Sequence, residues 1–379
     1  MTSPLVGPVS GIEDGTSHIF ELDDLKAHLQ EVSSQPNAKL LDGSLIERVY
    51  LQLNERNVLP VTEVLLSPVA DILFRTNQDA RPLIALARKL IVPLTFSQLR
   101  ELAGPDELMI ALGSEWPGAN LLALEILSSA GRNAAKVAVL RDHPEVTRQM
   151  MSLCLNSEDV SVSQTAMRVL RTLLEANHES VRPNGVHHHA ANGNDGPADL
   201  PFDNVLWRQL FSDEQGLLTI LDSCHATSAN TAEDMKRITT AQGRLLEFLP
   251  QLIHVNPDAI STARFPERYR LTQETSLPGG YGVLQWAALE MIDRTDELMY
   301  RQLLDFWRAL ILRVYIESET SCIRTILSAM MHSAVWHDEG LIEVFRQIPD
   351  QAIHLYQAGE VEADAMRQGL SAFIQQLIE

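Results

Sequence analysis

Three groups of residues in this sequence have types and spacings that could support chemistry. Cys224 and His225 are neighbours, and a thiolate beside an imidazole can act as a nucleophile with its base. The run His187–His189 offers imidazole nitrogens to a metal ion. The stretch "PGGYGVLQW" places Gly280 two residues before Gly282, as part of a phosphate-binding loop would. A nucleophile, a metal centre and a nucleotide site are therefore the chemistries to consider.

None of these groups has the surroundings that its chemistry requires. Cys224 ends an apolar helical segment, "LLTILDSC", which favours a buried cysteine over a reactive one. Adjacent histidines in a loop rich in Gly and Asn cannot converge on one ion from a rigid frame. The glycine pair lacks a third glycine and a preceding strand, so it favours a turn or a helix entry.

The sequence thus predicts no catalytic residue, no metal ligand and no cofactor, and a protein that is not an enzyme. An enzyme with a helical fold would need a convergent polar pocket, and the acidic residues are instead scattered along the predicted helices.

Composition narrows the class of partner and the compartment. The 379 residues include 50 acidic and 30 basic side chains, and a net charge of −20 repels nucleic-acid phosphate and anionic lipid. Neither nucleic acid nor a membrane is therefore an expected partner. The sequence opens without a basic and apolar leader, and no apolar run reaches about 18 residues. With three widely spaced cysteines, it predicts a reduced, soluble protein of the cytoplasm or also the nucleus.

The elements that must position any site are helices. From residue 18 nearly to the end, apolar residues recur at i, i+3 and i+4, and no alternation of period two is sustained, so the fold class is all-α. We expect a disordered tail over 1–17, N-terminal helical repeats over 18–176, a low-complexity flexible loop over 177–203 and C-terminal helical repeats over 204–379. Core packing is the predicted role of four tryptophans: Trp207, Trp286, Trp307 and Trp336.

An internal repeat predicts the architecture. Shifted by 43 positions, "LGSEWPGANLLALEIL" (112–127) lies over "LNSEDVSVSQTAMRVL" (155–170), and each follows an apolar helix. Fainter copies occupy 73–91 and 292–310, with Asp296 aligned to Asp159 at a helix N-cap position. Helix, polar turn and helix at this period is typical of HEAT or armadillo units, which are about 40–47 residues long. The sequence therefore predicts a curved solenoid of helical repeats.

Such a solenoid would present the polar side chains of its second helices along one face. In "SQTAMRVLRTLLEA" the apolar positions leave a polar set on the outward side, and similar positions occur in the other copies, where Arg88 and Lys89 are further possible members. The candidate partner-binding face consists of Gln164, Arg168, Arg171, Glu175, Glu125, Arg301 and Arg308. Ordinary solvated helix charge is the alternative for each of these residues.

At these residues the chain resembles a known family. "FSQLRELAGPDELMIAL", "HPEVTRQMMSLCLNSEDVSVSQTAMRVLRTLL", "LWRQLFSDEQGLLTIL" and "AQGRLLEFLPQLIHVNP" are similar to the assembly chaperone of the 26S proteasome base, of the non-ATPase subunit 5 type, whose fungal members carry a mismatch-repair label. The resemblance spans roughly residues 60–310 and is strongest over 95–175. It rests on repeat-like text and not on a short motif, so it transfers no contact residues.

The resemblance implies a C-shaped helical-repeat solenoid without enzymatic activity. It would bind the C-terminal helical domain of an AAA+ ATPase subunit while the regulatory-particle base assembles, and be absent from the mature proteasome. The chain departs from the family in its shorter C-terminal part and in the segment 177–203. The alternative function is a general helical-repeat scaffold or adaptor in transport, signalling or DNA mismatch repair.

Overall fold

The computed structural model consists of helices joined by turns. In the described part of the chain all regular secondary structure is helical, which confirms the predicted all-α class. The structure describes residues 19–76, 78–130, 137–179, 204–225, 231–262, 264–269, 281–317, 321–338, 340–356 and 360–378. The predicted tail over 1–17 lies outside these residues, as does most of the predicted loop.

The chain divides into two compact units, Met1–Ser129 and Ala130–Glu379. The predicted break at 177–203 therefore lies inside the second unit. Its first part is helical, since a single helix continues to Glu179, and residues 180–203 lie outside the described residues.

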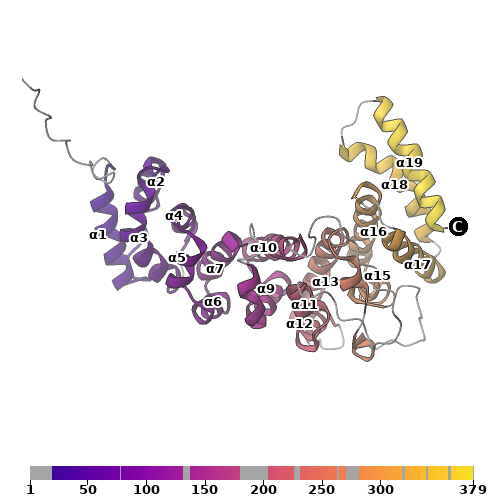
Figure 1. Ribbon diagram of the computed structural model, residues 1–379, viewed down its shortest axis with the longest axis horizontal. Coiled ribbons are helices and arrows are strands. Elements are labelled where there is room, and N and C mark those ends of the chain that lie inside the picture. Colours follow the sequence, from indigo (N-terminus) through magenta and orange to yellow (C-terminus); the bar gives the residue numbers. More distant parts are fainter. Residues whose placement is uncertain are drawn as a thin grey trace, which may run out of the picture. The chain divides into compact units, whose positions relative to one another are not determined.

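The first unit is an array of helices in which α1 to α4 pack side by side (Figure 1). Apolar residues at helical spacing, such as Leu25, Leu29 and Val32 of α1, are fully buried in its core. The helices are α1 (Leu22–Ser34), α2 (Gly43–Gln52), α3 (Val58–Leu73), α4 (Arg81–Ile91), α5 (Phe96–Leu102), α6 (Pro105–Leu112) and α7 (Pro117–Ala130), the last of which ends at the unit boundary.

The second unit continues the pattern of paired helices. In it α9 packs against α10, α12 and α13, then α13 against α16, and α18 against α19 (Figure 1). Its helices are α9 (Pro144–Asn156), α10 (Val160–Glu179), α11 (Val205–Phe211), α12 (Glu214–Cys224), α13 (Ala232–Leu252), α14 (Pro257–Ser261), α15 (Val283–Leu289), α16 (Glu297–Glu317), α17 (Ser321–His337), α18 (Gly340–Tyr356) and α19 (Glu360–Ile378), with short 3-10 turns at Ala138–Asp142 and Pro266–Tyr269.

The predicted repeat is confirmed as two helical hairpins, α6–α7 and α9–α10. Asp159 caps α10, because its Oδ1 accepts a hydrogen bond from the Val162 amide at 3.0 Å. Asp296 caps α16 in the same way, accepting from the Met299 amide at 3.1 Å. The turn "SED" that precedes α10 is therefore a helix start.

A buried polar side chain closes each hairpin at the same place in the repeat. Asn120 of α7 donates from Nδ2 to the Ala111 carbonyl at 2.8 Å, and Ser163 of α10 donates from Oγ to the Cys154 carbonyl at 2.7 Å. Asn120 is also within hydrogen-bonding distance of the Leu112 and Ser114 carbonyls, both at 3.1 Å. In each hairpin a side chain of the second helix thus donates to a carbonyl near the C-terminal end of the first helix. The shift of 43 positions that relates the two hairpins also aligns the donors Asn120 and Ser163 with each other, and likewise the acceptors Ala111 and Cys154.

Replacing Asn120 with alanine is expected to destabilise the first unit by about 1–3 kcal/mol, because buried carbonyls lose their donor. Ser163→Ala, which removes one hydrogen bond to a carbonyl, should cost about 1 kcal/mol. The exposed Ser161 on the same helix as Ser163 provides the control Ser161→Ala. Urea unfolding followed by circular dichroism measures the free energy of unfolding of the three variants. Equal stability of Asn120→Ala and the parent protein would contradict a stabilising role of the Asn120 hydrogen bonds.

Hydrogen bonds join the two helix ends that flank residues 180–203. The Leu206 amide donates to Asn177 Oδ1 at 3.1 Å, and Trp207 Nε1 donates to the Leu174 carbonyl at 3.0 Å. The C-terminal turn of α10 and the start of α11 are therefore fixed together. Whatever lies between them, the two helices pack as consecutive elements of the array.

The prediction that all four tryptophans pack in the core is wrong for Trp336. Trp207, Trp286 and Trp307 are at most 2% exposed, but Trp336 near the end of α17 is 87% exposed. Helical spacing alone did not reveal the difference, because the helix that bears Trp336 has apolar residues on more than one side. Within the described residues, no helix combines the length and the apolar character that crossing a bilayer requires.

Candidate functional site

The cysteine that sequence places beside a histidine is inert. Cys224 is buried, and burial raises the pKa of its thiol to about 12. The ring of His225 packs against that of Trp286, with centroids 5.2 Å apart and the ring planes tilted by 57°. Cys154 is also buried and its thiol pKa is raised for the same reason. These geometries support the prediction that Cys224 is a core residue.

The exposed cysteine differs from the other two. Cys322 lies at the start of α17, with its Sγ 3.5 Å from Asp258 Oδ1. Partial burial of the thiol and the nearby carboxylate both raise the pKa of this cysteine. We expect a maleimide to add to one thiol per native chain and to three thiols in guanidinium. Intact-mass spectrometry counts the adducts; rapid labelling of a second thiol in the native protein would contradict the burial of Cys154 and Cys224.

Of the glycine pair, Gly282 begins a helix. Gly282 is the N-cap residue of α15, and its amide donates to Gln285 Oε1 at 2.9 Å. A Cβ at this position would lie 2.5 Å from the Ile260 carbonyl oxygen, so close backbone packing explains the glycine. Gly280 and the run His187–His189 lie outside the described residues. Among the residues that are described, no group of three or more His, Cys, Asp or Glu side chains could hold a metal ion.

The second helices of the second unit meet along one polar face. α10 packs on α13, and α13 packs on α16 (Figure 1). Twelve polar residues of these helices, each at least partly exposed, make up what we call the α10–α13–α16 face: Gln164, Arg168, Arg171, Glu175, Thr240, Arg244, Glu247, Gln251, Arg301, Gln302, Asp305 and Arg308.

Arg171 belongs to the framework of this face. Its Nε lies 3.3 Å from Glu175 Oε1 on the same helix, and its Nη1 donates to Gln251 Oε1 on α13 at 3.2 Å. It therefore ties α10 to α13. Arg168, one turn earlier, is exposed and has no ion pair among the described residues. Of the predicted arginines on α10, only Arg168 is free to meet a partner.

The predicted arginines of α16 are paired with acids. Arg301 Nη2 lies 2.5 Å from Glu297 Oε1, and Arg308 Nη1 lies 2.6 Å from Asp305 Oδ1. Exposed pairs of this kind contribute little to stability, about 0–1 kcal/mol, so a partner can replace either member at small cost. The face is thus a mixed-charge surface.

Glu125, Arg88 and Lys89 all form contacts within the first unit. The Glu125 carboxylate pairs with Arg88 of α4, and the Glu125 side chain is only 13% exposed. Lys89 Nζ donates to the Tyr50 carbonyl at 2.8 Å and lies over the Tyr50 ring. These three residues join the helices of the first unit, so a role for Glu125 in partner binding has no support from its contacts.

Sequence reasoning missed the contribution of α13. Arg244 Nη1 donates to the carbonyls of Leu155 at 2.9 Å and Ser157 at 2.8 Å, and so caps the C-terminal end of α9. Burial lowers the pKa of this guanidinium. Glu247, three residues further, is exposed and has no ion pair among the described residues. The spacing of Thr240, Arg244, Glu247 and Gln251 on one side of an amphipathic helix was the available signal.

A groove of about 510 Å³ runs between α13 and α16. Its floor includes Phe306 and Leu246, and its sides carry Arg244, Glu247 and Asp305. Gln302 leans over Gly243, where an added Cβ would lie 2.4 Å from Gln302 Oε1, and this buried oxygen has no hydrogen-bond donor among the described residues. A buried acceptor without a donor is unfavourable, and its burial keeps this oxygen from a ligand in the groove.

The α10–α13–α16 face therefore combines the features of a protein-binding surface. It has charges of both signs and a groove, on helices that pack on one another. Compared with known proteins, the chain matches no protein-family model and no curated protein.

Proposed function

We propose that this chain is a non-enzymatic assembly chaperone. Its helical repeats would bind the C-terminal helical domain of a proteasomal AAA+ ATPase subunit while the regulatory-particle base assembles, in the cytoplasm or nucleus. The resemblance of residues 95–175 to that chaperone family supplies the client. The observation that carries a binding role is the α10–α13–α16 face with its groove.

The physical argument for binding rests on availability. Arg168 and Glu247 are exposed charges without ion pairs among the described residues, and they lie on the adjacent helices α10 and α13. A partner that presents an acid to Arg168 and a base to Glu247 gains both interactions without breaking an ion pair of the described residues; the nearby Arg244 guanidinium also attracts Glu247. The groove between α13 and α16 adds a recess for a client side chain.

Purification of the tagged full chain from native lysate, followed by quantitative mass spectrometry, tests the proposal. We expect one base ATPase to be enriched with its assembly neighbours and without the proteolytic core particle. Recovery of mature proteasomes, or of no base ATPase, would overturn it. Specific enrichment of a transport, signalling or mismatch-repair complex in their place would assign the chain to the alternative scaffold function.

A further inference from the structure

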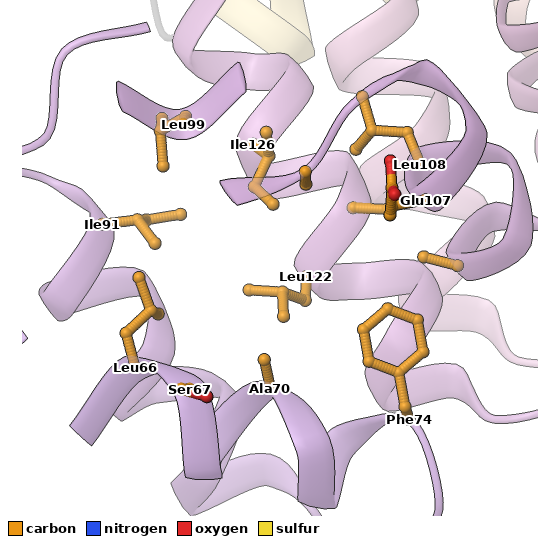
Figure 2. A pocket seen from close by; sticks show the side chains of 13 residues that line it. Leu66, Ser67, Ala70, Phe74, Ile91, Leu99, Glu107, Leu108, Leu122 and Ile126 are labelled. Carbon is orange, nitrogen blue, oxygen red and sulfur yellow. The ribbon is translucent and has the colours of Figure 1, made fainter. Parts of the chain in front are cut away.

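The first unit contains a hollow that no part of the proposed function uses. It lies among α3, α4, α5, α6 and α7 and has a volume of about 230 Å³ (Figure 2). Its lining is apolar except for Ser67 and Glu107. Figure 2 shows the side chains of Leu66, Ile91 and Leu122 directed toward the space from different helices. A concave, mostly apolar site with a few polar groups is the usual form of a small-molecule site.

One wall is a second apolar stripe on α3. Leu65, Val69 and Leu73 are fully buried on the packed side of the helix. Leu66 and Ala70, with Phe74 just beyond the helix end, follow one another at intervals of four residues and are only half-buried. These three side chains line the hollow, and the space opens to solvent beside the exposed Ser67.

The hollow depends on small side chains where larger ones would fit. Four of its lining residues are alanines: Ala70, Ala103, Ala111 and Ala123. The second hairpin of the repeat has a fully buried Cys154 where the first has Ala111, and a fully buried Met151 where the first has Leu108. The same hairpin can therefore be built with larger side chains at these positions.

The lining defines the chemistry of an occupant. Dry apolar cavities of about 150 Å³ take up benzene, so this one has room for an aromatic ring with a short alkyl chain. Glu107 is the one charged group in the lining and has no ion pair among the described residues. A carboxylate attracts a cation and repels an anion. Ser67 adds a hydroxyl on the opposite wall.

We propose that this cavity binds a small apolar amine. Its hydrocarbon part would lie among Leu66, Ile91, Leu99, Leu122 and Ile126, and its ammonium group would meet the Glu107 carboxylate. Fatty acids of the same size would be disfavoured by that carboxylate.

Three probes that differ only in the head group test the proposal on the full chain: 4-phenylbutylamine, butylbenzene and 4-phenylbutyric acid. Calorimetry should rank their affinities in this order. Glu107→Gln should weaken binding of the amine about tenfold and leave that of butylbenzene unchanged. Binding of the acid as tightly as the amine, or no binding of either the amine or butylbenzene, would overturn the proposal.

Filled variants locate the site. Ala70→Leu places a large side chain between Leu66 and Phe74, and Ala111→Cys installs the residue of the second hairpin. Ala70→Leu should weaken the binding of the amine and of butylbenzene at least tenfold, while thermal stability is retained or raised. Ala111→Cys should weaken the binding of both probes by a smaller factor. If Ala70→Leu fails to fold, Ala111→Cys still decides the matter. Unchanged affinities in a folded variant would show that the probes bind elsewhere and overturn the assignment.

Discussion

Replacing Trp207 with alanine is expected to lower the free energy of unfolding of the second unit by about 3–5 kcal/mol. The side chain is fully buried and packs on Phe211 with ring centroids 5.8 Å apart. Its indole also donates the 3.0 Å hydrogen bond to the Leu174 carbonyl that fixes α11 to the end of α10. The variant thus creates a cavity and also loosens the junction of two repeats.

Trp336→Ala is the matched control, since Trp336 is 87% exposed. Its effect should lie within about 0.5 kcal/mol, as for other surface substitutions. Denaturant unfolding followed by far-ultraviolet circular dichroism measures both variants without relying on tryptophan emission. If Trp336→Ala destabilised the protein as strongly as Trp207→Ala, the described burial of the two residues would be wrong.

Exchanging the free charges of the α10–α13–α16 face is expected to weaken client binding at least tenfold, or by about 1.4 kcal/mol. The double variant Arg168→Glu and Glu247→Lys keeps the net charge of the protein, so long-range attraction is unchanged while local complementarity is reversed. Both residues are exposed and unpaired among the described residues, so the melting temperature should change little. Arg171 is left intact because it holds α10 to α13.

The control exchanges charges of the same kind outside the face. Arg208 on α11 and Asp222 on α12 are exposed, and Arg208→Glu with Asp222→Lys again preserves net charge. Titration of the ATPase C-terminal domain with each double variant compares their affinities. Equal affinities of the two double variants would remove Arg168 and Glu247 from the client site.

Local pattern was enough to predict the fold class and the repeat units. Apolar residues at i, i+3 and i+4 predicted the helices. The repeat placed Asp159 at a helix N-cap and, in a fainter copy, Asp296 at another, where their carboxylates accept backbone N–H groups. The pattern did not predict the division at Ser129–Ala130, because packing between helices that are distant in sequence decides which helices form a compact unit.

The α10–α13–α16 face was harder to predict, because the sign of a side chain's charge does not reveal which residue it pairs with. Arg301 and Arg308 have acids four and three residues before them, and these pairs were readable from the helix spacing. The contacts of Arg171 with Gln251 and of Arg244 with Leu155 join residues about 80–90 positions apart, and only the tertiary packing sets them. Only the structure shows that Arg168 and Glu247 are both exposed and both without an ion pair among the described residues.

Site-specific photo-cross-linking tests the central claim most directly. A photoreactive phenylalanine replaces the exposed Gln164 on α10 in one full-length variant and the exposed Asp222 on α12 in another. Each variant is irradiated with purified C-terminal domains of the proteasomal ATPase subunits, and the adducts are mapped by mass spectrometry. We predict cross-links from position 164 to one ATPase domain and none from position 222. Cross-links from position 222 alone, or no ATPase adduct from either position, would contradict the account.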